Sequence, residues 1–98
     1  IESERIPAAR CVELGLANKA VPAEELQAAA MEWAESLSKR APRSLEATKK
    51  TMRHAIDNDW ASTYGLEADW QQALGGSDDN VEGVAAFFEK REPKFKGK

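Results

Sequence analysis

Residues 82–98 read EGVAAFFEKREPKFKGK, and they decide how the C-terminal end of the chain folds. Apolar residues recur there at steps of three and four, the spacing of one helix face: Val81, Val84 and Phe88. Phe87 lies off that stripe, because neighbouring residues of a helix are about 100° apart. Lys90 follows Phe87 by three positions, so an aromatic ring and a cation project from one side of the helix. This pair predicts a contact with a flat, anionic ligand.

The same stretch resembles the C-terminal pattern E-G-x-x-A-F-x-E-K-R-x-P-x-F-x-G of the enoyl-CoA hydratase/isomerase (crotonase) family. The matching positions keep a fixed register: Glu82, Gly83, Ala86, Phe87, Glu89, Lys90, Arg91, Pro93, Phe95 and Gly97. Residues 14–22, LGLANKAVP, resemble the family's L-G-L-V-N-x-V-V-P segment. Residues 41–49, APRSLEATK, resemble its A-P-x-A-x-x-x-T-K segment. Three segments in the family's order cover nearly the whole chain.

The resemblance implies that residues 1–98 are the C-terminal helical domain of a crotonase-like enzyme. The N-terminal catalytic spiral domain, with its oxyanion hole and acid/base glutamates, would lie outside this sequence. The intact parent would then hydrate an enoyl-CoA thioester or shift its double bond, in fatty acid metabolism. Hydratase, isomerase and other chemistries of the family stay open, because the residues that distinguish them lie upstream. The 98-residue piece alone is predicted to be inactive.

The resemblance also assigns a site and partners. It makes Phe87 and Lys90 contacts to the adenine-nucleotide end of coenzyme A, which is the substrate's carrier and not a bound cofactor. The helical domain would build the parent's trimer, with trimers pairing into hexamers, and the fragment itself could form dimers or trimers. No catalytic residue and no metal ligand is assigned to this chain.

The periodicity predicts an all-α fold of four to five short helices joined by Gly/Pro turns. The expected helices cover residues 6–14, 24–40, 44–58, 60–74 and 79–92, and residues 16–21 form one short extended segment. Pro42 is expected to break the chain before the third helix. That helix has one apolar face: Leu45, Thr48, Met52 and Ile56. Asp79 and Glu82 have the spacing of a capping box for the last helix.

The fourth predicted helix, residues 60–74, is apolar on two sides. One stripe contains Trp60, Tyr64 and Ala68, and the other contains Leu66, Trp70 and Ala73. A helix with this pattern is usually buried or packed at an interface, and a short chain has little room to bury it fully. The pattern therefore favours self-association, and all three tryptophans, including Trp33, are expected in a core or an interface.

Composition excludes several classes. The 98 residues make one domain at most, and no apolar run approaches the length of a membrane span. The net charge is −3, with basic residues concentrated in residues 89–98 and an acidic body before them. This balance argues against nucleic-acid binding and fits either a solvated tail or attraction for a phosphorylated ligand. Cys11 is the only cysteine, which excludes an internal disulfide and fits a reducing, cytoplasmic compartment.

Two other functions remain open. The apolar surface suits a stand-alone helical oligomerisation or interaction module without a small ligand. A small acyl-CoA carrier is the other, although its lysine- and tyrosine-bearing motifs are not evident. Two acidic pairs, Glu24-Glu25 and Asp78-Asp79, lie at helix starts, where capping and the helix dipole explain them. His54 is the only histidine and is predicted to be a surface or boundary residue, not a metal ligand.

Overall fold

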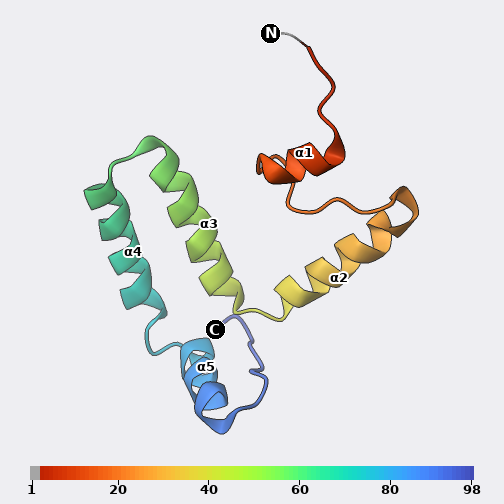
Figure 1. The fold of residues 1–98 in the computed structure, drawn as a ribbon. Helices are drawn as coiled ribbons and strands as arrows, with labels where there is room; N and C mark the ends of the chain where they lie inside the picture. Colours follow the sequence, from red (N-terminus) through yellow and green to blue (C-terminus); the bar gives the residue numbers. More distant parts are fainter. Residues whose placement is uncertain (1–2) are drawn as a thin grey trace. The chain divides into compact units, whose positions relative to one another are not determined.

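The computed structural model describes residues 3–98, and the regular elements found there are all helical (Figure 1). They are α1 (Ala8–Glu13), the short 3₁₀ turn η1 (Ala23–Glu25), α2 (Leu26–Ser38), α3 (Pro42–Asp57), α4 (Trp60–Leu74) and α5 (Asp78–Glu89). The chain divides into two compact units, residues 1–34 and 35–98. The predicted all-α class is confirmed, with helix ends close to those expected.

Helix α1 ends where the sequence predicted, at Gly15. The N–H of Leu16 donates to the Cys11 carbonyl at 2.8 Å and the N–H of Gly15 donates to Val12 at 3.0 Å, which together form a Schellman motif. Gly15 has φ +73, a conformation that glycine adopts without strain. Residues 16–21, expected to be extended, form a turn and loop instead of a strand. Their first amides satisfy α1 carbonyls, so they are not free for a sheet ladder.

Helices α3 and α4 form a hairpin and lie side by side (Figure 1). The break predicted at Pro42 is present, because α2 ends at Ser38, but Pro42 is itself the first residue of α3, two residues before the expected start at Ser44. Its fixed φ and missing N–H are tolerated there, because the first amides of a helix have no intrahelical acceptor. After a two-residue connection, Asp59 caps α4 by accepting the Ser62 N–H at 2.8 Å.

The face of α3 that meets α4 is not the apolar stripe that the sequence predicted. Ala47 is only 7% exposed, and His54 on the same side bonds to Ser62 of α4. Met52 and Ile56, by contrast, are 67% and 79% exposed. Small side chains let two helix backbones approach closely, so the small face packs inward. Met52 and Ile56 are thus left largely without cover in residues 35–98, whereas Leu45 is half-buried.

Helix α5 begins at Ser77, whose side chain accepts the Asn80 N–H at 3.2 Å. The capping box predicted for Asp79 and Glu82 is therefore wrong, because both residues lie inside the helix. Their carboxylates instead bind backbone amides of the C-terminal tail. The helix also ends earlier than expected, at Glu89 and not near Pro93.

The buried core within residues 3–98 is small. It contains Ala47, Ala86 and one charged residue, Asp79. The α5 stripe predicted to face a core is largely exposed: Val81 at 60%, Val84 at 52% and Phe88 at 77%. No helix in the described part of the chain is long and apolar enough to cross a membrane.

The tryptophans, like the apolar residues of α5, are more exposed than core residues would be. Trp60 is 78% exposed and stacks on Tyr64 with ring centroids 5.1 Å apart. Trp33 is about half exposed, and Trp70 is half-buried with Lys50 Nζ 5.2 Å from its ring centroid. Trp60 is thus not a core residue of the described chain. Its assignment to an interface remains a prediction.

Candidate functional site

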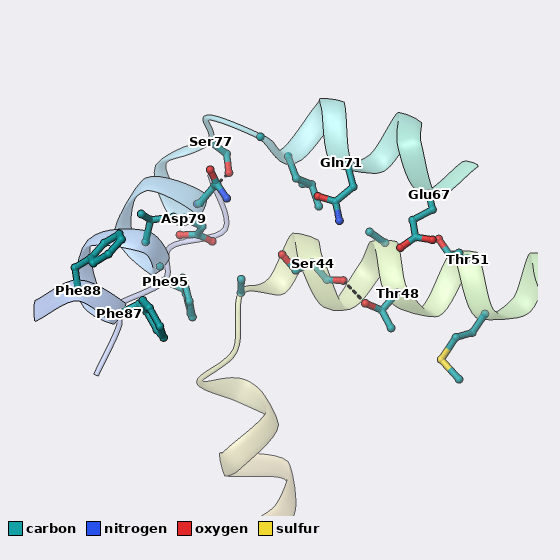
Figure 2. A pocket seen from close by; sticks show the side chains of 18 residues that line it. Ser44, Thr48, Thr51, Glu67, Gln71, Ser77, Asp79, Phe87, Phe88 and Phe95 are labelled. Carbon is teal, nitrogen blue, oxygen red and sulfur yellow. Dashed lines mark hydrogen bonds between the residues drawn. The ribbon is translucent and has the colours of Figure 1, made fainter. Parts of the chain in front are cut away.

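A groove of about 650 Å³ lies within the second unit, between α3, α4, α5 and the tail. Figure 2 shows its two kinds of lining. Hydroxyl, carboxylate and amide side chains come from α3 and α4: Ser44, Thr48, Thr51, Glu67 and Gln71. Aromatic rings come from α5 and the tail: Phe87, Phe88 and Phe95. An apolar wall with a few polar groups opposite is the usual composition of a small-molecule site.

Phe87 lies in the groove wall. It is 78% exposed, and its ring meets that of Phe88 edge to face with centroids 5.7 Å apart. Exposed rings of this kind offer a flat face on which a planar group can stack. Phe88, expected on the core side, is equally exposed and also lines the groove.

Lys90 occupies the turn that ends α5. Its backbone is left-handed, with φ 54 and ψ 40. The Arg91 N–H donates to Ala86 at 3.0 Å and the Lys90 N–H to Phe87 at 3.3 Å, the same Schellman pattern that ends α1. Gly15 fills the equivalent position of α1, whereas a side chain here costs about 1–2 kcal/mol of backbone strain. The groove lining includes Phe87 but not Lys90, so the two lie on different parts of the surface.

Glu82 and Arg91 form an ion pair that the sequence did not reveal. The Arg91 guanidinium donates two hydrogen bonds to the Glu82 carboxylate, at 2.6 and 2.9 Å. The Lys94 backbone N–H donates a third at 2.7 Å. The Arg91 hydrogen bonds, followed by that of Lys94, lower the pKa of Glu82 from 4.5 to about 2. Nine residues separate the pair, which is too far for helix periodicity to predict it.

The tail keeps its lysine side chains exposed, as expected for a solvated tail, but its backbone is bound to α5. Asp79 is 6% exposed, and its two oxygens accept the N–H groups of Lys96 and Gly97 at 2.6 and 2.8 Å. The Asp79 N–H donates in turn to the Lys98 carbonyl at 2.9 Å. Phe95 lies over Gly83: a Cβ there would be 3.5 Å from the ring. The tail thus runs back along α5 and supplies part of the groove wall.

A second cluster joins α3 to α4 around His54. Its Nε2 lies 2.9 Å from Ser62 Oγ, and its Nδ1 lies 3.4 Å from Asn58 Nδ2. The Asn58 amide also donates to the His54 carbonyl at 2.9 Å, which fixes its NH₂ group toward both atoms. The two ring nitrogens thus link Ser62 of α4 to Asn58 at the end of α3. The cluster fastens the hairpin.

The comparisons with known proteins decide the family. The sequence model of the enoyl-CoA hydratase/isomerase family matches residues 1–98. This chain belongs to that family. A probable mitochondrial enoyl-CoA hydratase 2 of Arabidopsis thaliana is 33% identical over 93 residues, which cover 95% of this chain and 31% of the plant protein. A probable enoyl-CoA hydratase of Rhodobacter capsulatus is 34% identical and is matched over 98% of this chain and 37% of its own length.

Solved structures agree with the sequence matches. The crystal structure of an enoyl-CoA hydratase from a Polaromonas species matches this fold with a TM-score of 0.91 at 33% identity. That match covers 95% of this chain and 36% of the crystallised one. The chain thus spans about a third of the length of these relatives. Among relatives with other names is a methylmalonyl-CoA decarboxylase of Escherichia coli, 32% identical over 94% of this chain and 36% of its own length.

Proposed function

We propose that residues 1–98 are the C-terminal helical part of an acyl-CoA-acting enzyme of this family. In this proposal the end of α5 binds the adenine-nucleotide end of coenzyme A. The relatives named above as hydratases and as a decarboxylase share CoA thioester substrates by name, which supports that substrate class. The order of the three motif segments, ending in residues 82–98, supports the C-terminal placement.

One observation carries the ligand contact: Phe87 is 78% exposed in the wall of an open groove. An aromatic side chain so exposed, in a groove with polar groups opposite, can stack on adenine. Lys90 lies one turn further along, at the helix end, where its ammonium can reach a phosphate as a charge-assisted donor. In the proposal one ligand bridges the two, with its base in the groove and its phosphates outside.

The test is a titration of the chain with coenzyme A, followed by amide shifts in NMR spectra. We expect shifts at Phe87 and Lys90, and weaker binding in Phe87→Ala and Lys90→Gln. Trp60→Ala is the matched control, because it removes an equally exposed ring that does not line the groove. Equal losses from Phe87→Ala and Trp60→Ala would contradict the assignment of the stacking ring to Phe87.

The chain alone is proposed to be catalytically inactive. Acid/base catalysis on an enoyl thioester needs positioned carboxylates and two backbone N–H donors over the thioester oxygen. Glu67 is an exposed carboxylate in the groove lining, whereas both oxygens of Asp79 already accept hydrogen bonds from backbone amides. Measurable hydration of crotonyl-CoA by the pure chain would refute this statement.

A second function is favoured by a different observation. Large apolar side chains are exposed on every long helix, among them Leu26, Met31, Met52, Ile56, Trp60 and Val81. Exposed apolar surface of this extent marks protein contacts. We therefore also propose that the chain serves assembly, either in the parent's trimer or as an interaction module by itself. Sedimentation that shows a monomer at all concentrations would count against the module.

A further inference from the structure

The C-terminal strap, defined as residues 94–98, is held by one buried acid. Asp79 accepts the N–H groups of Lys96 and Gly97, and its own N–H donates to Lys98. No Lys, Arg or His side chain of residues 3–98 forms an ion pair with this carboxylate. A buried carboxylate without a counter-ion depends on its hydrogen bonds, so the strap amides are the groups that satisfy the Asp79 oxygens.

The strap divides its side chains between two surfaces. Phe95 lines the aromatic end of the groove, whereas Lys94 and Lys96 line a separate hollow beside Arg91. Alternate residues of an extended chain point to opposite sides, which explains the division. Residues flanking Phe95 on either side therefore fix it: Glu82 holds the N–H of Lys94, and Asp79 holds that of Lys96.

Gly97 completes the attachment. Its φ of +78 directs the chain beyond the Gly97 nitrogen, where the Lys98 carbonyl accepts the Asp79 N–H at 2.9 Å. Only glycine adopts this conformation readily. The open space over Gly83 then receives the Phe95 ring. Burial, hydrogen bonding and backbone conformation thus act together to place one aromatic side chain.

We propose that Asp79 is a positioning residue for the groove. By holding the strap amides it keeps Phe95 in the groove wall, and it thereby sets the affinity of the groove for the adenine end of coenzyme A. The ligand part of this inference rests on the proposed function. The positional part concerns the chain alone and can be measured without ligand.

The test compares Asp79→Asn with Asp78→Asn in the full 98-residue chain. Asp78 is the exposed neighbour, so its variant removes the same charge. An asparagine at 79 keeps one acceptor and turns an NH₂ group toward a strap N–H. We expect amide exchange at Lys96 and Gly97 to accelerate at least about tenfold in Asp79→Asn, the size of a lost hydrogen bond to a charged group. In Asp78→Asn it should not change.

Two further readouts separate positioning from mere stability. The Gly83 amide shift reports the Phe95 ring current, and it should move toward its value in Phe95→Leu when Asp79 is replaced. Gly97→Ala should release the strap with Asp79 intact, since alanine disfavours φ +78. Both Asp79→Asn and Gly97→Ala should weaken binding of coenzyme A several-fold, and Asp78→Asn should leave it unchanged.

The outcomes test the positioning of Phe95 and the effect on coenzyme A binding separately. Unchanged exchange and an unmoved Gly83 shift in both strap variants would overturn the inference outright. Faster exchange with undiminished coenzyme A affinity would reduce Asp79 to a structural residue. If the wild-type chain binds no coenzyme A, the proposed function fails and the ligand part of this inference fails with it. A moved Gly83 shift would then still establish that Asp79 places Phe95.

Discussion

The Glu82 carboxylate and the Arg91 guanidinium meet in a two-point ion pair, with N–O distances of 2.6 and 2.9 Å. Glu82 lies within α5, and Arg91 follows the turn that ends it. The same carboxylate accepts the N–H of Lys94, where the strap begins. One acid therefore ties together the helix, its terminal turn and the returning tail.

This arrangement predicts an acid-sensitive tail. The pKa of Glu82 is lowered from 4.5 to about 2, so its bonds to Arg91 and Lys94 stabilise the folded chain above pH 4.5. That stabilisation is lost as the pH falls from 4.5 toward 2, because the unfolded chain then binds the proton more readily. We expect the Glu82 carboxyl to titrate near pH 2 by NMR. Glu82→Gln should remove the pH dependence of the Lys94 protection factor, which compares its exchange rate with that of an unfolded chain at the same pH.

Glu92→Gln is the control for that experiment, since it removes a carboxylate next to Arg91 that forms no ion pair with it. Its Lys94 amide should keep the wild-type pH dependence. A Glu82 titration midpoint at an ordinary 4.5 would contradict the prediction.

Lys90→Gly is expected to stabilise the chain. Lys90 sits at φ 54 in the position that Gly15 fills at the end of α1. Removing the side chain should raise the free energy of unfolding by about 1 kcal/mol, measured by urea denaturation. Gly15→Ala is the mirror experiment and should lower it by a similar amount. Strain retained at a cation is a sign of function, so the stabilised Lys90→Gly should also bind coenzyme A more weakly.

Local signals in the sequence located the helices well. The conformational freedom of glycine predicted that α1 stops at Gly15. Apolar periodicity predicted α4 over residues 60–74. Periodicity failed for the buried faces. It selected Met52 and Ile56 on α3, yet Ala47 is buried there. A pattern of large apolar residues locates the surface that needs cover but does not say what covers it.

The groove shows the same difference: features that depend on neighbouring residues could be predicted, and contacts between distant residues could not. Helix geometry alone separated Phe87 from the α5 stripe, yet the stripe residues Val84 and Phe88 line the groove together with it. The contacts of Asp79 and Glu82 were misread as capping. Their partners lie 9 to 18 residues further along the chain, beyond the end of α5. Nothing in the spacing of Asp79 and Gly97 indicates that they meet. Only a returning tail brings them together, and no periodicity predicts a return.

Gly83 is expected to tolerate alanine but not leucine. A Cβ at this position would lie 3.5 Å from Phe95, an ordinary contact, and alanine is a better helix former than glycine by about 1 kcal/mol. Gly83→Ala should therefore raise the urea midpoint. Leucine would extend into the ring of Phe95 and displace the strap, so Gly83→Leu should accelerate Gly97 amide exchange. Slow exchange at Gly97 in the leucine variant would contradict the close approach.

Asp59 should act through its hydrogen bond and not through its charge. Its side chain accepts the Ser62 N–H at 2.8 Å at the start of α4, where four amides lack helical partners. Asp59→Ala should cost about 1 kcal/mol in unfolding free energy, whereas Asp59→Asn should cost much less, since asparagine caps as well. Asp57→Ala is the charge-matched control at the opposite helix end. Asp57 is the last residue of α3, where an acid opposes the helix dipole, so this variant should be neutral or slightly stabilising. Equal losses from Asp59→Asn and Asp59→Ala would show that the charge, and not the cap, is what α4 requires.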